Sequence, residues 1–138
     1  MTPHRDTRFR AACQVRVRYA DTDAMGVVYY ANYLAFFESA RVEYIRAIGC
    51  SYREMEESGV YLPVIEAQCE YRRPARYDDD VEIHTTGSVI SPVRMSFTYR
   101  VSVKGRDEAT AMGRTSHAAT GPDGRPCRLP ARVLEVFA

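Results

Sequence analysis

The longest regular pattern of apolar residues lies in the first half of the chain and has helical spacing. From Tyr33 onward, the apolar positions are Phe36, Phe37, Ala40, Tyr44, Ala47 and Ile48. Residues spaced by three and four fall on one face of an α-helix, and this face continues for about four turns. Leu34, Val42 and Ile45 widen it, which predicts a helix covered on more than one side. Gly49 then ends the helix, because glycine enters the left-handed conformation without strain.

Alternating apolar and polar residues predict one strand before this helix and four after it. The first covers residues 13–19, and the later ones cover 60–72, 81–90, 93–104 and 108–120. A short second helix is expected at 51–58, because Ser51 can cap its start and Glu54 follows three residues later. Another short helix follows Pro130. A strand, a long helix and four consecutive strands give an α+β domain with an antiparallel sheet.

A single helix cannot cover both faces of such a sheet, which bears on how the chain assembles. Several predicted strands place a second set of apolar or small residues on the other face. A homodimer or homotetramer would cover that surface. The 138 residues fit one domain over the whole chain, 1–138, and the polar stretch 1–11 is expected to be flexible.

Composition narrows the classes of partner and location. Lysine and arginine number 19 against 18 aspartates and glutamates, so no overall basic field favours nucleic acid. No apolar run approaches the ~20 residues that cross a bilayer, and the basic start lacks the apolar core of a signal peptide. The four cysteines are too scattered for a zinc site, which favours free thiols and a reducing, cytoplasmic location.

An acidic loop directly before the long helix is the strongest candidate for chemistry. It contains Asp21, Thr22 and Asp23, followed by Gly26. The first amides of a helix have no internal partner and lie at the positive end of its dipole, so they can polarise a carbonyl oxygen. A nearby carboxylate can then attack the carbonyl carbon or activate a water molecule. The alternative is structural: both aspartates satisfy loop amides in caps or turns.

Residues 21–33, DTDAMGVVYYANY, closely resemble the signature of the 4-hydroxybenzoyl-CoA thioesterase family, and weaker similarity extends over roughly residues 13–130. The resemblance implies the hot-dog fold, a curled antiparallel sheet wrapped around one long central α-helix. It implies hydrolysis of a coenzyme A thioester of a short, medium or aryl acid, in a dimer with a continuous sheet that often pairs into a tetramer. Asp23 would be the nucleophile or general base, and the backbone N–H of Tyr30 would polarise the thioester carbonyl. No metal or redox cofactor is implied, because coenzyme A is part of the substrate.

Residues beside the loop complete the expected site. Contacts with the substrate are expected from Gly26, Val27, Tyr29 and Tyr33. A neighbouring branch of the family has a histidine where this chain has Tyr30, so a histidine-assisted mechanism does not carry over, whereas a backbone donor does. Tyr29, Tyr33 and Tyr61 suit a pocket for an aromatic ring, and they equally suit the core.

The phosphates of coenzyme A require cations, and the chain offers many arginines. The candidates are Arg72, Arg73, Arg76, Arg94, Arg100, Arg114, Arg125 and Arg128. Arg94 is preferred, because members of the family often bring the cofactor past the turn that corresponds to Ser91 and Pro92. The acidic run 78–80 lacks the spaced ligands of a cation site, and a solvated turn is expected there.

Three alternatives use the same fold. Glu38, two turns into the helix, is a rival catalytic carboxylate, as in some other hot-dog thioesterases; its structural alternative is a surface pair with Arg41. A non-catalytic module that binds acyl thioesters would have no need of Asp23. A hot-dog dehydratase would need a histidine near the helix, whereas His117 is expected to be a neutral, hydrogen-bonded strand residue.

Overall fold

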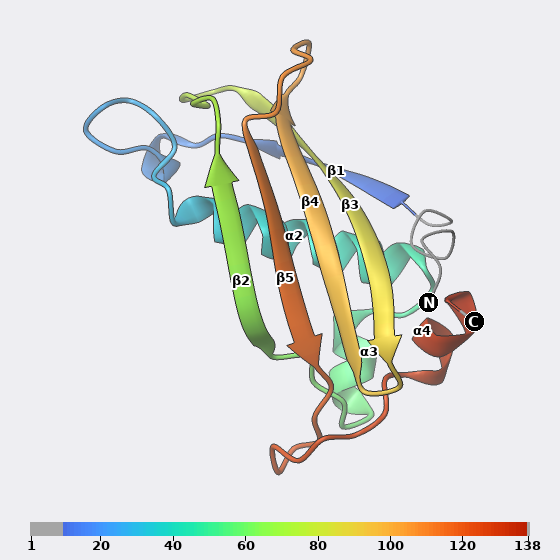
Figure 1. Ribbon diagram of the computed structural model, residues 1–138. Helices are drawn as coiled ribbons and strands as arrows, with labels where there is room; N and C mark the ends of the chain where they lie inside the picture. Colours follow the sequence, from blue (N-terminus) through green and yellow to red (C-terminus); the bar gives the residue numbers. More distant parts are fainter. Residues whose placement is uncertain (1–9, 138) are drawn as a thin grey trace.

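Five antiparallel strands form one curved sheet, and a long helix lies across one of its faces (Figure 1). The computed structural model describes residues 10–137. In chain order the elements are β1 (Arg10–Arg16), the 3-10 turn η1 (Tyr19–Asp21), α2 (Asn32–Ala47), α3 (Tyr52–Glu57), β2 (Val64–Tyr71), β3 (Asp80–Ser91), β4 (Arg94–Val103), β5 (Ala111–Ala118) and α4 (Ala131–Val136). The strand order is β1-β3-β4-β5-β2, so β1 and β2 form the two edges. The predicted α+β class and hot-dog fold are confirmed.

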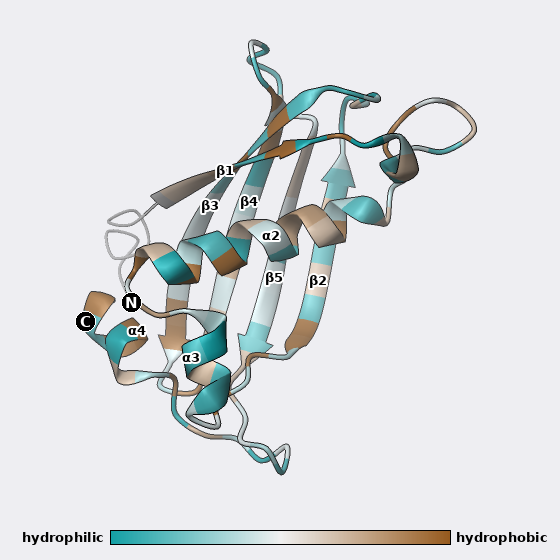
Figure 2. Cartoon of the chain, turned by 180° about the vertical axis from the view of Figure 1, so that it is seen from behind, coloured by the Kyte–Doolittle hydropathy of each residue, from teal (hydrophilic) through white to brown (hydrophobic). Residues whose placement is uncertain are grey.

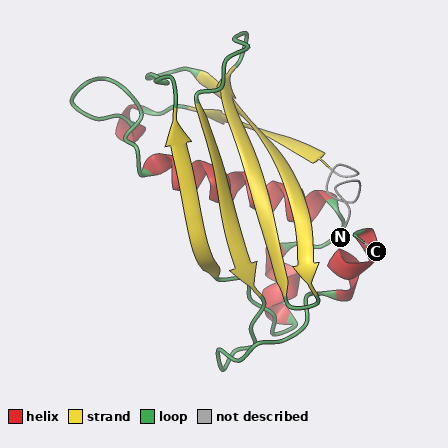
Figure 3. Ribbon diagram, viewed as in Figure 1, coloured by secondary structure: helices red, strands yellow, loops and turns green. Residues whose placement is uncertain are grey.

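Each predicted helix and strand is present, with ends that differ by a few residues. The cap of α3 is as expected: the Ser51 hydroxyl oxygen accepts a hydrogen bond from the Glu54 amide at 3.0 Å. The helices lie on one side of the sheet, and four consecutive strands follow α2 and α3 along the chain, as the periodicity predicted (Figure 3). Among the described residues, no helix has the length and apolar character needed to cross a membrane.

The first strand is shifted relative to its prediction. It ends at Arg16, because the carboxylate of Asp21 binds both the amide and the guanidinium of Arg18 and turns the chain into η1. Tyr19, expected on the buried face of a strand, is therefore 80% exposed. Arg10 and Ala11 were expected to be flexible but belong to β1, where they pair with β3. The rest of that stretch, residues 1–9, lies outside the described residues.

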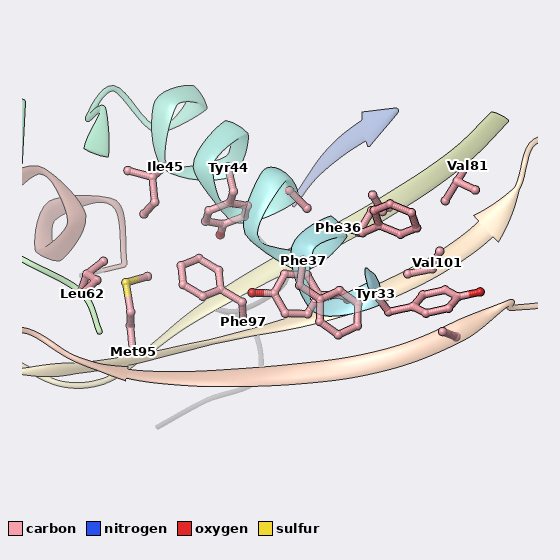
Figure 4. Packing of buried hydrophobic residues seen from close by; sticks show 14 of the residues in the cluster. Tyr33, Phe36, Phe37, Tyr44, Ile45, Leu62, Val81, Met95, Phe97 and Val101 are labelled. Carbon is pink, nitrogen blue, oxygen red and sulfur yellow. The ribbon is translucent and has the colours of Figure 1, made fainter. Parts of the chain in front are cut away.

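The hydrophobic core lies between α2 and the sheet (Figure 4). Phe37 stacks on Tyr99 with ring centroids 4.3 Å apart, and Tyr44 meets Phe97 edge to face at 5.5 Å. The helix can approach this closely because β5 carries Gly113: a Cβ atom there would lie 2.3 Å from the Phe37 ring. The small residues of β5 thus provide the room that the aromatic side chains of α2 occupy.

The face of the sheet that points away from α2 is mostly polar, so it carries less apolar surface than the sequence led us to expect. Residues His84, Thr86, Thr98 and Arg100 line a shallow depression on it. Most apolar residues of β3 and β4 are buried against the helix, whereas Ile90 of β3 is 60% exposed and Met112 of β5, which also lines the depression, is 38% exposed.

Exposed apolar side chains gather instead at the β2 edge and at the loop before α2, which lies beside the Tyr71 end of β2 (Figure 2). Ile65 is 49% exposed and Tyr71 is 50% exposed, and every residue of β2 except the half-buried Cys69 is exposed. Edge strands normally bury or blunt such surface. A partner at β2 would therefore cover exposed apolar side chains of this edge.

Candidate active site

The loop between η1 and α2 folds as a tight turn around Asp23. The Gly26 amide donates to the Asp23 carbonyl at 2.9 Å, and the Asp23 amide donates to the Val27 carbonyl at 2.9 Å. The Met25 amide donates to the Asp23 carboxylate oxygen Oδ1 at 2.8 Å. Gly26 has φ +79°, a conformation that other residues adopt only with strain. The sequence Asp-x-x-Gly thus fixes the backbone that carries the carboxylate.

Hydrogen bonds hold this loop against the start of α2. The Asn32 side-chain amide donates to the Asp21 carbonyl at 2.8 Å, and the Tyr29 amide donates to the same carbonyl at 2.9 Å. On the other side, the Val28 amide donates to the Ala75 carbonyl at 2.8 Å. The loop, the helix start and the segment after β2 therefore form one rigid corner.

Asp21 performs the structural role that the sequence left open for both aspartates. It is buried, and both carboxylate oxygens accept hydrogen bonds from Arg18. Burial alone would raise the pKa of Asp21, but the hydrogen bonds and charge of Arg18 lower that pKa below its usual value. Asp21 is thus an ionised cap with no free oxygen for chemistry.

Asp23 differs because one of its oxygens remains free. Among residues 10–137, Oδ2 of this half-buried side chain has no hydrogen-bond or ion-pair partner. The side chain lines a cavity of about 320 Å³ together with Met25, Val27, Val28, Tyr30, Tyr33, Tyr71, Arg72, Arg73 and Pro74. The Asp23 carboxylate and residues at the start of α2, Tyr30 and Tyr33, therefore line the same cavity.

Two successive amides at the start of α2 are available as donors. Within the described part of the chain, neither the Tyr30 nor the Ala31 N–H donates to a protein acceptor. Tyr30 itself lines the cavity that contains Asp23. Free amides at a helix N-terminus are suited to an oxygen that acquires negative charge.

Aromatic rings form one wall of the cavity. Tyr71, at the end of β2, meets Tyr33 edge to face at 5.4 Å and Tyr30 at 6.2 Å. Burial raises the pKa of Tyr33 to about 12, so its hydroxyl is neutral at physiological pH. The wall is therefore uncharged and largely apolar, although each ring also carries a hydroxyl group.

A profile of the thioesterase-like superfamily matches residues 17–137 of this chain. The chain belongs to that superfamily. The predicted family is thereby confirmed, and the matched range includes all the residues of the cavity.

Individual relatives agree with this assignment. An Aquifex aeolicus protein described as an esterase is 37% identical over 122 residues, which cover 88% of this chain and 93% of the relative. The acyl-CoA thioester hydrolase YbgC of Escherichia coli is 42% identical over 87 residues, covering 63% of this chain and 65% of the relative. The structure of a DHNA-CoA thioesterase from Staphylococcus aureus superposes with a TM-score of 0.87 at 30% identity, covering 93% of this chain and 88% of that one.

The structure brings together some of the predicted site residues and leaves others apart. Val27 and Tyr33 line the cavity with Asp23, whereas Gly26 shapes the turn beneath it. Tyr29 is outside the cavity lining and 44% exposed, with its ring 4.8 Å from that of Tyr30.

Arg94 is not near Asp23 within the chain. It begins β4 opposite Ala118, at the end of the sheet where β2 starts, whereas the cavity lies where β2 ends. Tyr61 lies at that same distant end, in a bridge with Thr120. The antiparallel topology, which sequence spacing does not reveal, separates these residues from the loop.

Arg72 and Arg73 line the cavity instead, and the sequence had offered them only among eight arginines. The Arg72 guanidinium donates to Glu70 at 2.9 Å. The Arg73 side chain has no hydrogen-bond or ion-pair partner among residues 10–137. Arg73 is thus a free cation beside the candidate carboxylate.

The rival carboxylate Glu38 is exposed on α2 and does not line the cavity. Its expected surface pair with Arg41 is wrong, because Arg41 is only 8% exposed and points toward the core. The charge of Arg41 influences the pKa values of Tyr52, Tyr99 and His117. Arg41 lies one helical turn after Phe37 and so falls on the buried face of the helix. The sequence had suggested a surface position because arginine is usually exposed.

His117 is inside the core, as expected. Its ring nitrogens contact the Leu62 carbonyl at 3.0 Å and the Thr115 hydroxyl at 2.9 Å. Burial lowers the pKa of His117 to about 4, so it is neutral at physiological pH. Across the described residues, no group of three or more histidine, cysteine and acidic side chains is arranged to hold a metal ion.

Proposed function

We propose that this protein hydrolyses a coenzyme A thioester, with Asp23 as the catalytic carboxylate and the amides at the start of α2 as oxyanion donors. The observation that carries the proposal is the cavity in which Asp23, with one free oxygen, lies beside Tyr30, whose amide is also free. The superfamily match and the relatives named as acyl-CoA thioesterases support thioester hydrolysis. A non-catalytic binding module, the alternative, gives no reason for a half-buried carboxylate with an unused oxygen.

In this mechanism, the thioester oxygen accepts hydrogen bonds from the Tyr30 and Ala31 amides, which stabilise the negative charge of the tetrahedral intermediate. Asp23 either attacks the carbonyl carbon or removes a proton from a water molecule that attacks it. The C–S bond then breaks, the coenzyme A thiolate takes up a proton, and the oxygen of water remains in the free acid. If Asp23 attacks first, water hydrolyses the resulting anhydride.

The coenzyme would be held by cations at the mouth of the cavity. Arg73 lines the cavity and its guanidinium has no partner among residues 10–137, and Arg72 lines the cavity with it. Guanidinium groups bind phosphate oxygens through charge-assisted hydrogen bonds. We assign the first phosphate contact to Arg73 rather than to Arg94 of the same chain.

A homodimer through β2 would complete the site. Antiparallel pairing of two β2 edges around a two-fold axis would bring the start of the partner's β2 to the Tyr71 end of this one. Tyr61 precedes β2, and Arg94 begins β4 two strands away at the same end of the sheet, so the partner's copies would lie at the end of the joined sheet where the cavity lies. In this arrangement, Arg94 and Tyr61 of one subunit would contribute to substrate binding at the cavity of the other subunit. Light scattering that found a folded monomer at micromolar concentration would contradict this arrangement.

The function is tested by release of free coenzyme A thiol from a panel that includes hexanoyl-CoA and benzoyl-CoA. Hydrolysis of at least one thioester, with saturation at micromolar to millimolar substrate, is expected. Binding of the same thioesters without any thiol release would establish the alternative binding module. The protein is expected to work in the cytoplasm, where these thioesters occur in reducing conditions.

A further inference from the structure

One hydrogen bond joins the edge strand to the helix start at the candidate oxyanion site. The Tyr71 hydroxyl donates to the Tyr30 carbonyl oxygen at 3.0 Å, across 41 residues of sequence. Loss of water around Tyr71 and its contact with the Cys69 thiol raise the pKa of Tyr71 to about 12. The hydroxyl is therefore protonated, and able to donate, at physiological pH.

This hydrogen bond acts on the peptide group that carries the free Ala31 N–H. The Tyr30 carbonyl belongs to the peptide group whose N–H is that of Ala31, and rotation of that peptide moves both atoms together. The preceding peptide is held separately, because the Asn32 amide donates to the Tyr29 carbonyl at 2.9 Å. The first-turn bond from the Tyr33 amide to the Tyr30 carbonyl is long, at 3.3 Å. Tyr71 thus provides the shorter of the two bonds that fix the Tyr30–Ala31 peptide.

We infer that Tyr71 is a positioning residue for the Ala31 N–H, one of the two proposed oxyanion donors. Its hydroxyl holds the Tyr30–Ala31 peptide in the orientation that presents this N–H to the thioester oxygen. The hydrogen bond at the carbonyl also polarises the Ala31 N–H, because hydrogen bonds on the two sides of a peptide strengthen each other. This inference rests on the proposed hydrolysis and adds to it a residue from β2 that does not touch the reacting atoms.

The Tyr71 ring has a separate role from its hydroxyl. It packs edge to face against Tyr33 and Tyr30 and forms part of the cavity wall. Tyr71→Phe removes the hydroxyl and keeps these ring contacts, so it separates positioning from packing. Tyr77→Phe is a matched control, since Tyr77 is also largely exposed, contacts the Tyr19 ring and lies outside the cavity.

The test measures kcat and KM with whichever of hexanoyl-CoA and benzoyl-CoA the wild type hydrolyses faster. In Tyr71→Phe, kcat is expected to fall by about 10-fold, less than the 10²–10³ lost when an oxyanion donor is removed outright. KM is expected to stay within about 2-fold, because the donors act mainly in the transition state. Tyr77→Phe is expected to match the wild type. An unchanged kcat in Tyr71→Phe, or a raised KM alone, would overturn the inference.

A second measurement does not depend on turnover. The amide ¹H–¹⁵N signals of Tyr30 and Ala31 are expected to shift in Tyr71→Phe and to remain in place in Tyr77→Phe. If the wild type released no thiol from any thioester, the proposed hydrolysis would fail, and these signals would still decide whether Tyr71 orients the peptide. Signals that were identical in Tyr71→Phe and the wild type would show that it does not.

Discussion

The core around His117 and the loop around Asp23 both contain an ionisable side chain. The two regions differ in how many hydrogen-bond partners the protein supplies to that side chain. In the core, His117 is completely buried, and both of its ring nitrogens are within hydrogen-bond distance of a partner. At the start of α2, Asp23 has one oxygen without a partner among residues 10–137, and the Tyr30 and Ala31 amides have no acceptor there. Histidine is the more common acid–base residue in enzymes, yet here it is the inert one.

This difference gives a criterion for distinguishing structural from catalytic polar groups in this fold. A group whose partners are all supplied by the chain has no capacity left for a substrate. Asp21 and Asp23 repeat the contrast two residues apart, since Arg18 uses both oxygens of Asp21. A free carboxylate beside free amides is the combination that hydrolysis of a thioester requires.

The largest expected effect comes from Asp23→Asn, which removes the charge and basicity of the free oxygen. We expect kcat to fall by roughly 10²-fold or more, the scale of losing a positioned acid–base group. Substrate affinity should stay level or increase, because repulsion between the carboxylate and the coenzyme phosphates is removed. Steady-state kinetics together with direct binding of the thioester to the variant would measure both quantities.

Two variants made in parallel serve as controls for Asp23. Asp21→Asn should lower the free energy of unfolding by about 1 kcal/mol, as expected for a lost cap, and folded protein should retain activity. Glu38→Gln should be active, because Glu38 lies outside the cavity. Full activity in Asp23→Asn with loss in Glu38→Gln would move the catalytic carboxylate onto α2.

The second effect concerns His117 and the stability of the fold in acid. The pKa of His117 falls from 6.5 to about 4 on folding, so the unfolded chain binds the proton more tightly. Stability from the neutral ring is therefore fully present above pH 6.5 and is lost as the pH falls toward 4. The whole difference is worth about 3 kcal/mol, at about 1.4 kcal/mol for each pH unit.

Denaturant unfolding between pH 7.5 and pH 4.5 would measure this dependence. His117→Gln cannot titrate, so its free energy of unfolding should change less over that interval than that of the wild type. His84→Gln is the matched control, because His84 is exposed on the outer face of the sheet, and it should follow the wild type. Identical pH dependence in His117→Gln and the wild type would contradict the prediction.

Periodicity predicted α2 and all five strands, because each buries one face and polar residues occupy the other. The loop residues Asp23 and Tyr30 were also identified from sequence, since the motif that carries them is local. Tyr71 was not among the predicted site residues and Arg73 was only one of eight candidate arginines, because contacts distant in sequence place the end of β2 beside the loop. Sequence spacing also did not reveal that Arg94 lies at the other end of the sheet within the chain, so its contact with the coenzyme stays a prediction.

The third effect tests how closely α2 must approach the sheet. Gly113→Ala would place a methyl group 2.3 Å from the Phe37 ring, so the helix or the ring must move. Overpacking of this kind costs about 1–3 kcal/mol of stability. Thermal unfolding would detect it. Combining Gly113→Ala with Phe37→Leu should cost less than the sum of the two single changes, because the smaller side chain leaves room for the methyl group.

The smallest expected effect comes from Arg73→Gln at the mouth of the cavity. Arg73 is exposed, so loss of one phosphate contact should raise KM for a coenzyme A thioester by about 5-fold, close to 1 kcal/mol, and leave kcat unchanged. The increase should diminish in high salt, which screens the contact in the wild type. Hydrolysis of the corresponding pantetheine thioester, which lacks the nucleotide phosphates, should be equal in the variant and the wild type.

Arg94→Gln in the same assay tests whether the coenzyme site is formed by one chain or by the proposed dimer. Arg94 lies at the opposite end of the sheet from the cavity, so a monomer gives it no route to the coenzyme. In an antiparallel β2 dimer, the partner's Arg94 approaches the cavity, and its loss should raise KM in the way that loss of Arg73 does. Because the two guanidinium groups would bind one coenzyme, the double variant should show a KM no lower than either single variant. A raised KM for Arg94→Gln in a protein that light scattering found monomeric would contradict both the proposed pairing and the assignment of the first contact to Arg73.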